Sequence, residues 1–85
     1  MEYVVVAFRS RAHTVKFAEI LRRGGVSAEI INTPKEAGVG CGLSVKVSKT
    51  DFLTVKRVAF SLGLSSFAGC FLVTLMSGKR IVRTI

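Results

Sequence analysis

The stretch Tyr3-Val4-Val5-Val6-Ala7-Phe8 (YVVVAF) is an unbroken run of apolar residues, most of them β-branched or aromatic. A strand with one face in water alternates apolar and polar residues. A continuous apolar run is typical of a strand that is covered on both faces or lies centrally in its sheet. The run therefore predicts a central strand at residues 3–8, and the other elements are expected to be arranged around it.

A helix is predicted directly after this strand. Ser10 offers a hydroxyl for the N-cap, and apolar residues then recur at helical spacing, at Ala12, Val15, Ala18 and Leu21. Arg22 and Arg23 fall in the last turn, where positive charge complements the helix dipole. Gly24-Gly25 supplies a left-handed stop, so the helix is expected to end there.

The remaining chain is predicted to form four more strands and a second helix. Apolar runs or clean apolar–polar alternation mark the strands, Pro34 closes the first of them, and Ser77-Gly78 is a hairpin turn. Thr50-Asp51 caps the second helix, and Gly63 ends it. The apolar stripe of this helix comprises Phe52, Val55, Ala59 and Leu62. The predicted strands are residues 28–33, 43–48, 67–76 and 80–85.

The resulting order is β-α-β-β-α-β with one extra C-terminal strand. We expect an α+β fold of the ferredoxin-like type, a two-layer sandwich in which both helices cover one face of the sheet. Right-handed crossovers place the first strand in the middle. The chain shows no internal repeat or linker, so residues 1–85 are expected to form one domain.

Composition narrows the function classes. The chain has 85 residues, of which 49% are hydrophobic and 21% charged, which argues against disorder. Its formal net charge of +8 attracts nucleic acid, an acidic protein or a small anion, although a merely solvated basic surface is an equally simple interpretation. Two cysteines and one histidine are too few for a disulfide scaffold or a structural zinc site, and neither a metal nor a cofactor is expected.

Localisation follows from the same features. The N-terminus lacks the basic segment of a signal peptide, so a reducing cytoplasm with both thiols free is expected. Residues 58–78 carry no charge and are flanked by Arg57 and Lys79. This uncharged stretch is long enough for a membrane-spanning helix. Serines, Gly63 and Gly69 interrupt this stretch, so a membrane location is not favoured.

The candidate site is Cys41, in the stretch Gly38-Val39-Gly40-Cys41-Gly42-Leu43-Ser44. In the predicted topology, this cysteine starts the third strand at the sheet edge where the first strand ends, next to Arg9, Ser10 and Arg11. The two arginines and the helix N-terminus favour an anion there, and electropositive surroundings favour the reactive thiolate. Gly40 and Gly42 leave the sulfur sterically bare. The alternative is that Cys41 is a small, semi-buried residue at a strand start and the glycines serve only the turn.

Other residues carry weaker signals. His13 could assist Cys41 as a base or simply face solvent, and Cys70 lies in an apolar run, which predicts a core position. The glycines at 38–42 lie between two strands, which is the wrong context for a phosphate-binding loop. An RNA-recognition surface would need aromatics on the first and third strands. Tyr3 and Phe8 could serve on the first, but the third has none, so nucleic acid is not favoured as a partner.

The chain resembles the family of selenium/sulfur carrier-like proteins. The resemblance covers about residues 3–47: Phe8-x-Ser10, His13 opening a helix, Ile20-Leu21-Arg22, Thr33-Pro34, and Cys41-Gly42-Leu43-Ser44. It implies that Cys41 is the carrier thiol, holding sulfur or selenium as a persulfide or selenosulfide.

A carrier of this kind has no independent turnover. It would accept its cargo from a desulfurase-type donor and pass it to an acceptor, and the C-terminal extension could mark a homodimer edge. The alternative from another class is a small regulatory or interaction module whose exposed sheet edge pairs with another chain.

Overall fold

The computed structural model describes residues 1–85 and has two helices and five strands. The α+β class and the order of elements agree with the sequence prediction. The strands are β1 (Glu2–Phe8), β2 (Ala28–Asn32), β3 (Leu43–Ser48), β4 (Phe67–Met76) and β5 (Lys79–Thr84). The helices are α1 (Arg11–Arg23) and α2 (Phe52–Leu62), with short 3₁₀ turns η1 (Lys35–Ala37) and η2 (Lys49–Asp51).

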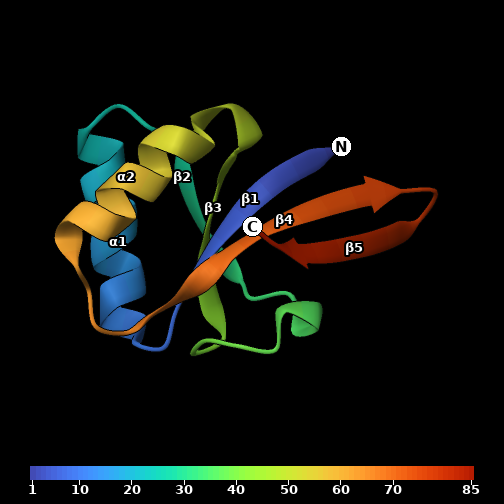
Figure 1. The fold of residues 1–85 in the computed structure, drawn as a ribbon, viewed down its shortest axis with the longest axis horizontal. Helices are drawn as coiled ribbons and strands as arrows, with labels where there is room; N and C mark the ends of the chain where they lie inside the picture. Colours follow the sequence, from blue (N-terminus) through green and yellow to red (C-terminus); the bar gives the residue numbers. More distant parts are fainter.

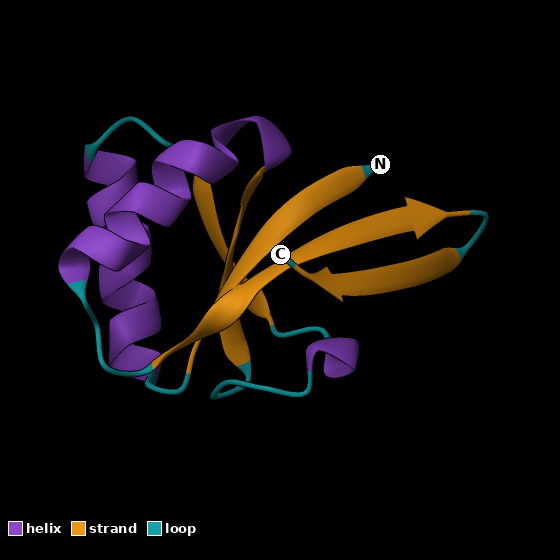
Figure 2. Ribbon diagram, in the orientation of Figure 1, coloured by secondary structure: helices purple, strands orange, loops and turns teal.

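All five strands form one antiparallel sheet in the order β2-β3-β1-β4-β5. β1 lies in the middle, as its apolar run predicts: Val6 pairs with Val45 of β3 on one side and with Cys70 of β4 on the other. Both helices pack on the same face of the sheet, whereas the β4–β5 hairpin projects away from them (Figures 1 and 2). The hairpin turn at Ser77 and Gly78 is confirmed, because both residues have positive φ, as a tight two-residue turn requires.

The helix-covered face of the sheet holds the main core. Val4, Val6 and Phe8 point into it from β1, and all are at most 1% exposed. The Phe8 ring packs against Phe17 of α1 with centroids 5.1 Å apart and edge-on against Phe67 of β4 at 5.9 Å. Since aromatic rings bury the largest apolar areas, this cluster dominates the packing of α1 and β4 onto β1.

The predicted apolar stripe is correct for α2 and partly wrong for α1. Phe52, Val55, Ala59 and Leu62 all pack into or against the core. In α1 the buried residues are Thr14, Phe17, Ala18 and Leu21, while Ala12 and Val15 are exposed. The helix is rotated because burying Phe17 removes far more apolar surface from water than burying Ala12.

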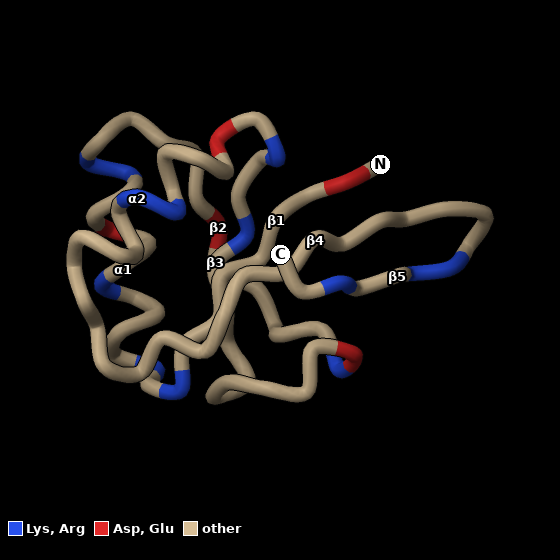
Figure 3. Tube along the Cα trace, in the orientation of Figure 1, with Lys and Arg blue, Asp and Glu red and all other residues tan.

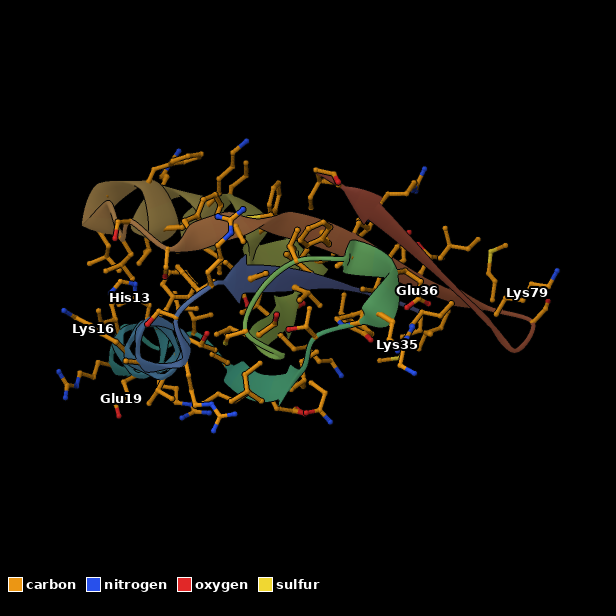
Figure 4. The ribbon with its side chains drawn as sticks, turned by 90° about the horizontal axis from the view of Figure 1, so that it is seen from below. His13, Lys16, Glu19, Lys35, Glu36 and Lys79 are labelled. Carbon is orange, nitrogen blue, oxygen red and sulfur yellow. The ribbon has the colours of Figure 1, made fainter.

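The opposite face of the sheet has no α-helix, yet its central residues are also buried. Val5, Ala7 and Val73 on this face are fully buried and Phe71 is 6% exposed. The segment 33–42, which we call the β2–β3 loop, lies on this side (Figures 1 and 4). Gly40 of the loop packs so closely that a Cβ there would lie 3.7 Å from that of Ala7. β1 is therefore covered on both faces.

An ion pair joins the β2–β3 loop to β5. The Arg80 guanidinium donates to both carboxylate oxygens of Glu36, with Nη2–Oε1 at 2.7 Å and Nε–Oε2 at 2.9 Å. These hydrogen bonds hold the pKa of Glu36 below its ordinary value of 4.5. Figure 4 shows Glu36 on η1, beside the β4–β5 hairpin.

This lowered pKa predicts a specific pH dependence. A carboxyl group whose pKa is lower in the folded state stabilises the protein above its ordinary pKa, and this contribution disappears as the pH falls through the lowered value. Glu36→Gln is therefore expected to lower the urea midpoint at pH 7 and to leave it nearly unchanged at pH 2. Arg80→Gln should give the same profile, and the double variant should add nothing further. An equal effect of Glu36→Gln at both pH values would contradict a role for the ion pair.

The uncharged residues 58–78 do not form one continuous element. They are divided among the end of α2, a turn, β4 and the hairpin turn. No helix in the structure has the length and apolar character needed to cross a membrane.

Candidate functional site

Three segments that are distant in sequence meet at one edge of the sheet. β1 ends there at Phe8, opposite Phe67, where β4 begins; its penultimate residue, Ala7, pairs with Ser44 near the start of β3. Cys41 lies two residues before the start of β3, and its backbone N–H donates to the Phe8 carbonyl at 3.1 Å. The predicted meeting of Cys41 with the end of β1 and the start of α1 is therefore present in the structure.

The Cys41 thiol is half-buried and free. Its Sγ lies 3.6 Å from the Leu43 carbonyl oxygen, to which the thiol donates, and 3.8 Å from the Thr14 hydroxyl oxygen. This placement is intermediate between the bare, exposed thiol that the flanking glycines indicate and the semi-buried strand-start residue of the alternative. Part of the cysteine remains open to solvent, and its contacts hold the sulfur next to the first turn of α1.

Thr14 is a site residue that the sequence reasoning missed. Its side chain is fully buried, and its hydroxyl lies 3.1 Å from the Ser10 carbonyl and 3.4 Å from that of Leu43, in addition to its contact with Cys41. Thr14 thus connects the start of α1 to the cysteine. The available signal was its spacing, because positions 14, 17, 18 and 21 together form a better helical stripe than the predicted one.

Gly40 and Gly42 shape the chain on either side of Cys41. Their φ angles are +97° and +95°, in the left-handed half of conformational space where side chains are strained. At Gly40 a Cβ would also lie 3.3 Å from the Phe8 carbonyl oxygen, which accepts the Cys41 N–H, whereas at Gly42 it would meet nothing within 4 Å. The two glycines therefore differ in function: both serve the turn, but only Gly40 allows close packing on β1.

Alanine substitutions should separate these two effects. Gly42→Ala is expected to cost about 1–2 kcal/mol of unfolding free energy from backbone strain alone. Gly40→Ala should cost more, since the Phe8 carbonyl must also shift. Urea unfolding of both variants measures the difference, and an equal or smaller loss for Gly40→Ala would show that close packing at this position is unimportant.

Ser10 caps α1, as predicted, and the His13 ring bonds to Ser66 and not to the cysteine. The Ser10 hydroxyl accepts from the His13 N–H at 3.2 Å. The His13 ring Nδ1 lies 2.6 Å from the hydroxyl oxygen of Ser66, in the turn before β4. Figure 4 shows His13 between α1 and the layer formed by α2 and β4. No hydrogen bond joins His13 to Cys41, so the histidine ties α1 to β4 at this edge.

Arg9 and Arg11 lie at the same edge and are exposed. Neither guanidinium forms an ion pair, because both pairs in the protein involve other cations. The Arg9 backbone N–H donates to the Ser66 carbonyl at 2.7 Å, which fixes the turn between β1 and α1. Figure 3 shows basic residues and no acidic residue at this turn. The edge that carries Cys41 is therefore electropositive, although no hydrogen bond connects either arginine to the thiol.

Cys70 occupies a different environment from Cys41. It is 6% exposed, belongs to the helix-side core, and is also free. Burial raises the pKa of the Cys70 thiol, which keeps it protonated and unreactive. The core position predicted for Cys70 is thus confirmed, and Cys41 is the more exposed of the two cysteines.

The aromatic residues considered for RNA stacking are not available as a pair. Phe8 is fully buried among Phe17 and Phe67, on the helix side of the sheet. Tyr3 is half-buried, with the Lys46 ammonium 4.5 Å from its ring centroid. Base stacking needs exposed rings on one sheet face, so this surface does not provide the RNA-recognition arrangement. No three metal-binding side chains cluster anywhere in the chain.

These features define a class: a small α+β domain that places one free, half-buried cysteine at a sheet edge with two exposed arginines. Comparison with known families identifies the family itself. The family described as "Putative Se/S carrier protein-like" matches residues 3–65, most of the chain, and the chain belongs to this family. No curated protein and no solved structure matches the chain. The matched region includes Cys41 and ends before β4, so the β4–β5 hairpin and Arg80 lie outside it.

Proposed function

We propose that the protein carries sulfur or selenium on Cys41. The observation that best supports this function is the contrast between its two free thiols: Cys41 is partly open at a basic sheet edge, whereas Cys70 is buried in the core. A carrier needs one thiol that a partner's active site can reach, with no second thiol nearby to form a disulfide and expel the cargo. Membership of the Se/S carrier-like family supports the same assignment.

The proposed transfer is an exchange between thiolate and persulfide. The Cys41 thiolate attacks the terminal sulfur of a persulfide on the donor enzyme's cysteine. A new S–S bond forms on Cys41, the donor's S–S bond breaks, and the donor cysteine leaves as its thiolate with the bond's electron pair. The proton of the terminal sulfur stays on that sulfur or passes to water. No oxidant or reductant is consumed. Delivery is the same exchange with Cys41 as the donor: a thiolate of the acceptor attacks the terminal sulfur, and Cys41 leaves as its thiolate.

The surroundings of Cys41 suit an anionic cargo. Arg9 and Arg11 are exposed cations without ion-pair partners at this edge, and the N-terminus of α1 adds a partial positive charge. Ser10 and His13 fix this N-terminus through the cap and through Ser66. Gly40 and Gly42 present no side chain that would shield the sulfur. We therefore assign supporting roles to these residues and the carrier role to Cys41 alone.

The proposal includes the cellular setting and the fold type. A desulfurase-type enzyme would be the donor, the carrier would have no turnover of its own, and a reducing cytoplasm would keep both thiols free.

The strand order β2-β3-β1-β4 with two helices on one face supports assignment to the ferredoxin-like arrangement, extended at one edge by β5.

Mass spectrometry tests the carrier function. The protein is incubated with cysteine and a cysteine desulfurase from the same cell, and its intact mass is measured without reductant. The wild type is expected to gain one sulfur atom, and Cys41→Ser none. A wild type that gains no sulfur from any desulfurase of that cell would refute the proposal.

A further inference from the structure

The outer face of α2 exposes two large apolar side chains. Leu53 is 69% exposed and Phe60 is 63% exposed. The two residues are seven positions apart, which places them two turns apart on the same face of the helix. This face flanks the buried stripe of α2, so apolar residues continue from the core side of the helix onto its exposed side. Contiguous exposed apolar surface is typical of interaction sites, so this pair makes the outer face of α2 a candidate surface for a partner.

Basic side chains lie between these two apolar residues. Lys56 and Arg57 line the same shallow groove as Leu53, Phe60 and Ser61. The Lys56 ammonium lies 6.0 Å from the ring centroid of Phe60. α2 contains no acidic residue, and neither Lys56 nor Arg57 forms an ion pair. Figure 3 shows the basic positions on α2, and the nearest acidic residue along the chain is Asp51, which precedes the helix. The face therefore combines apolar surface with uncompensated positive charge.

The same face leads to the edge that carries Cys41. The Phe60 ring packs on Phe67 with centroids 6.0 Å apart, and Phe67 in turn packs edge-on against Phe8. The Phe8 carbonyl accepts the Cys41 N–H. The exposed Arg9 and Arg11 lie at this edge as well, so both α2 and the edge with Cys41 carry basic side chains. A protein that binds α2 and also extends over this edge would bring its own residues to Cys41.

We propose that the outer face of α2 is the docking surface for the sulfur donor, through an acidic patch on the donor that surrounds an apolar recess. Phe60 and Leu53 enter the recess, while carboxylates of the donor face Lys56 and Arg57. Opposite charges increase the rate of encounter and fix the orientation in which the two active sites meet. The identity of the donor rests on the proposed carrier function, whereas the choice of an acidic, apolar-centred partner rests on the α2 face itself.

The experiment measures binding and transfer separately. ¹⁵N-labelled protein is titrated with the cysteine desulfurase of the same cell, and the rate of sulfur transfer to Cys41 is followed at several carrier concentrations. The variants are Lys56→Glu/Arg57→Glu and Phe60→Ser. The matched control is Lys79→Glu/Arg83→Glu, which changes the net charge equally on the hairpin. Loss of the α2 contact should raise the half-saturating carrier concentration about tenfold or more, which corresponds to about 1.4 kcal/mol of binding free energy, with little change in the control.

Each outcome decides between the two proposals. Amide shifts along α2, together with a raised half-saturating concentration for the α2 variants only, support both the docking surface and the carrier function. Shifts along α2 without transfer support docking and refute the carrier function. Normal transfer by the α2 variants, or equal loss in the hairpin control, refutes docking on α2 and leaves the carrier function intact. If neither binding nor transfer is observed, both the docking surface and the carrier function are refuted. Amide shifts along α2 that change with the concentration of this protein alone would reassign this face to self-association.

Discussion

Phe8→Ala is expected to destabilise the protein by about 3–5 kcal/mol, the usual loss when a buried phenylalanine in a core is truncated. Phe8 has no exposed surface, and its ring contacts Phe17 of α1 and Phe67 of β4. Removal of the ring leaves a cavity where the helix layer and the sheet meet. Since small domains have about 5–15 kcal/mol of total stability, much of the variant should be unfolded in modest urea.

Urea unfolding followed by circular dichroism measures this loss. Phe60→Ala is the matched control, because it removes the same side chain from a position that is 63% exposed, and it should change the unfolding free energy by no more than about 1 kcal/mol. Similar losses for the two variants would show that the core is not centred on Phe8.

The rates at which Cys41 and Cys70 are alkylated in the folded protein should differ by a large factor. Cys41 is partly exposed and reacts from the folded state, whereas Cys70 is buried among core residues and reacts only when the protein opens. If opening costs at least about 4–5 kcal/mol, Cys70 is protected about a thousandfold or more. Burial also raises the pKa of the Cys70 thiol, which further lowers its reactive fraction.

Iodoacetamide labelling followed by peptide mapping gives both rates in one experiment. The rate at Cys41 should be unchanged in Cys70→Ala, and the rate at Cys70 should approach that of Cys41 only in denaturing urea. Comparable rates in the folded protein would mean that the accessible thiol has been assigned incorrectly.

Local patterns were sufficient to predict most of the fold. The apolar run at residues 3–8 predicted the central strand, and the stripe Phe52, Val55, Ala59 and Leu62 predicted the buried face of α2. Gly63 and the Ser77-Gly78 turn marked boundaries correctly, since all three residues have positive φ. These features depend on periodicity and backbone conformation, which the sequence carries within a few residues. The meeting of Cys41 with the end of β1 then followed from topology.

The features that were missed depend on contacts between distant residues. Thr14 was overlooked because a threonine in an apolar stripe gives no sign of which backbone carbonyls its hydroxyl will reach. The bond of His13 to Ser66 joins residues 53 positions apart, and the Glu36–Arg80 ion pair spans 44 positions. Neither pair has any periodic signature. The half-buried state of Cys41 was expected only as the alternative, and its contact with Thr14, 27 positions away, has no local signature in the sequence.

The most direct test of the carrier function is the location of the sulfur after transfer. Wild type, Cys41→Ser and Cys70→Ala are each loaded by the desulfurase and cysteine, and their peptides are mapped by mass spectrometry. We predict one additional sulfur on the peptide containing Cys41 in wild type and in Cys70→Ala, and none in Cys41→Ser. Sulfur on Cys70, or equal loading of Cys41→Ser, would contradict the assignment of Cys41 as the carrier.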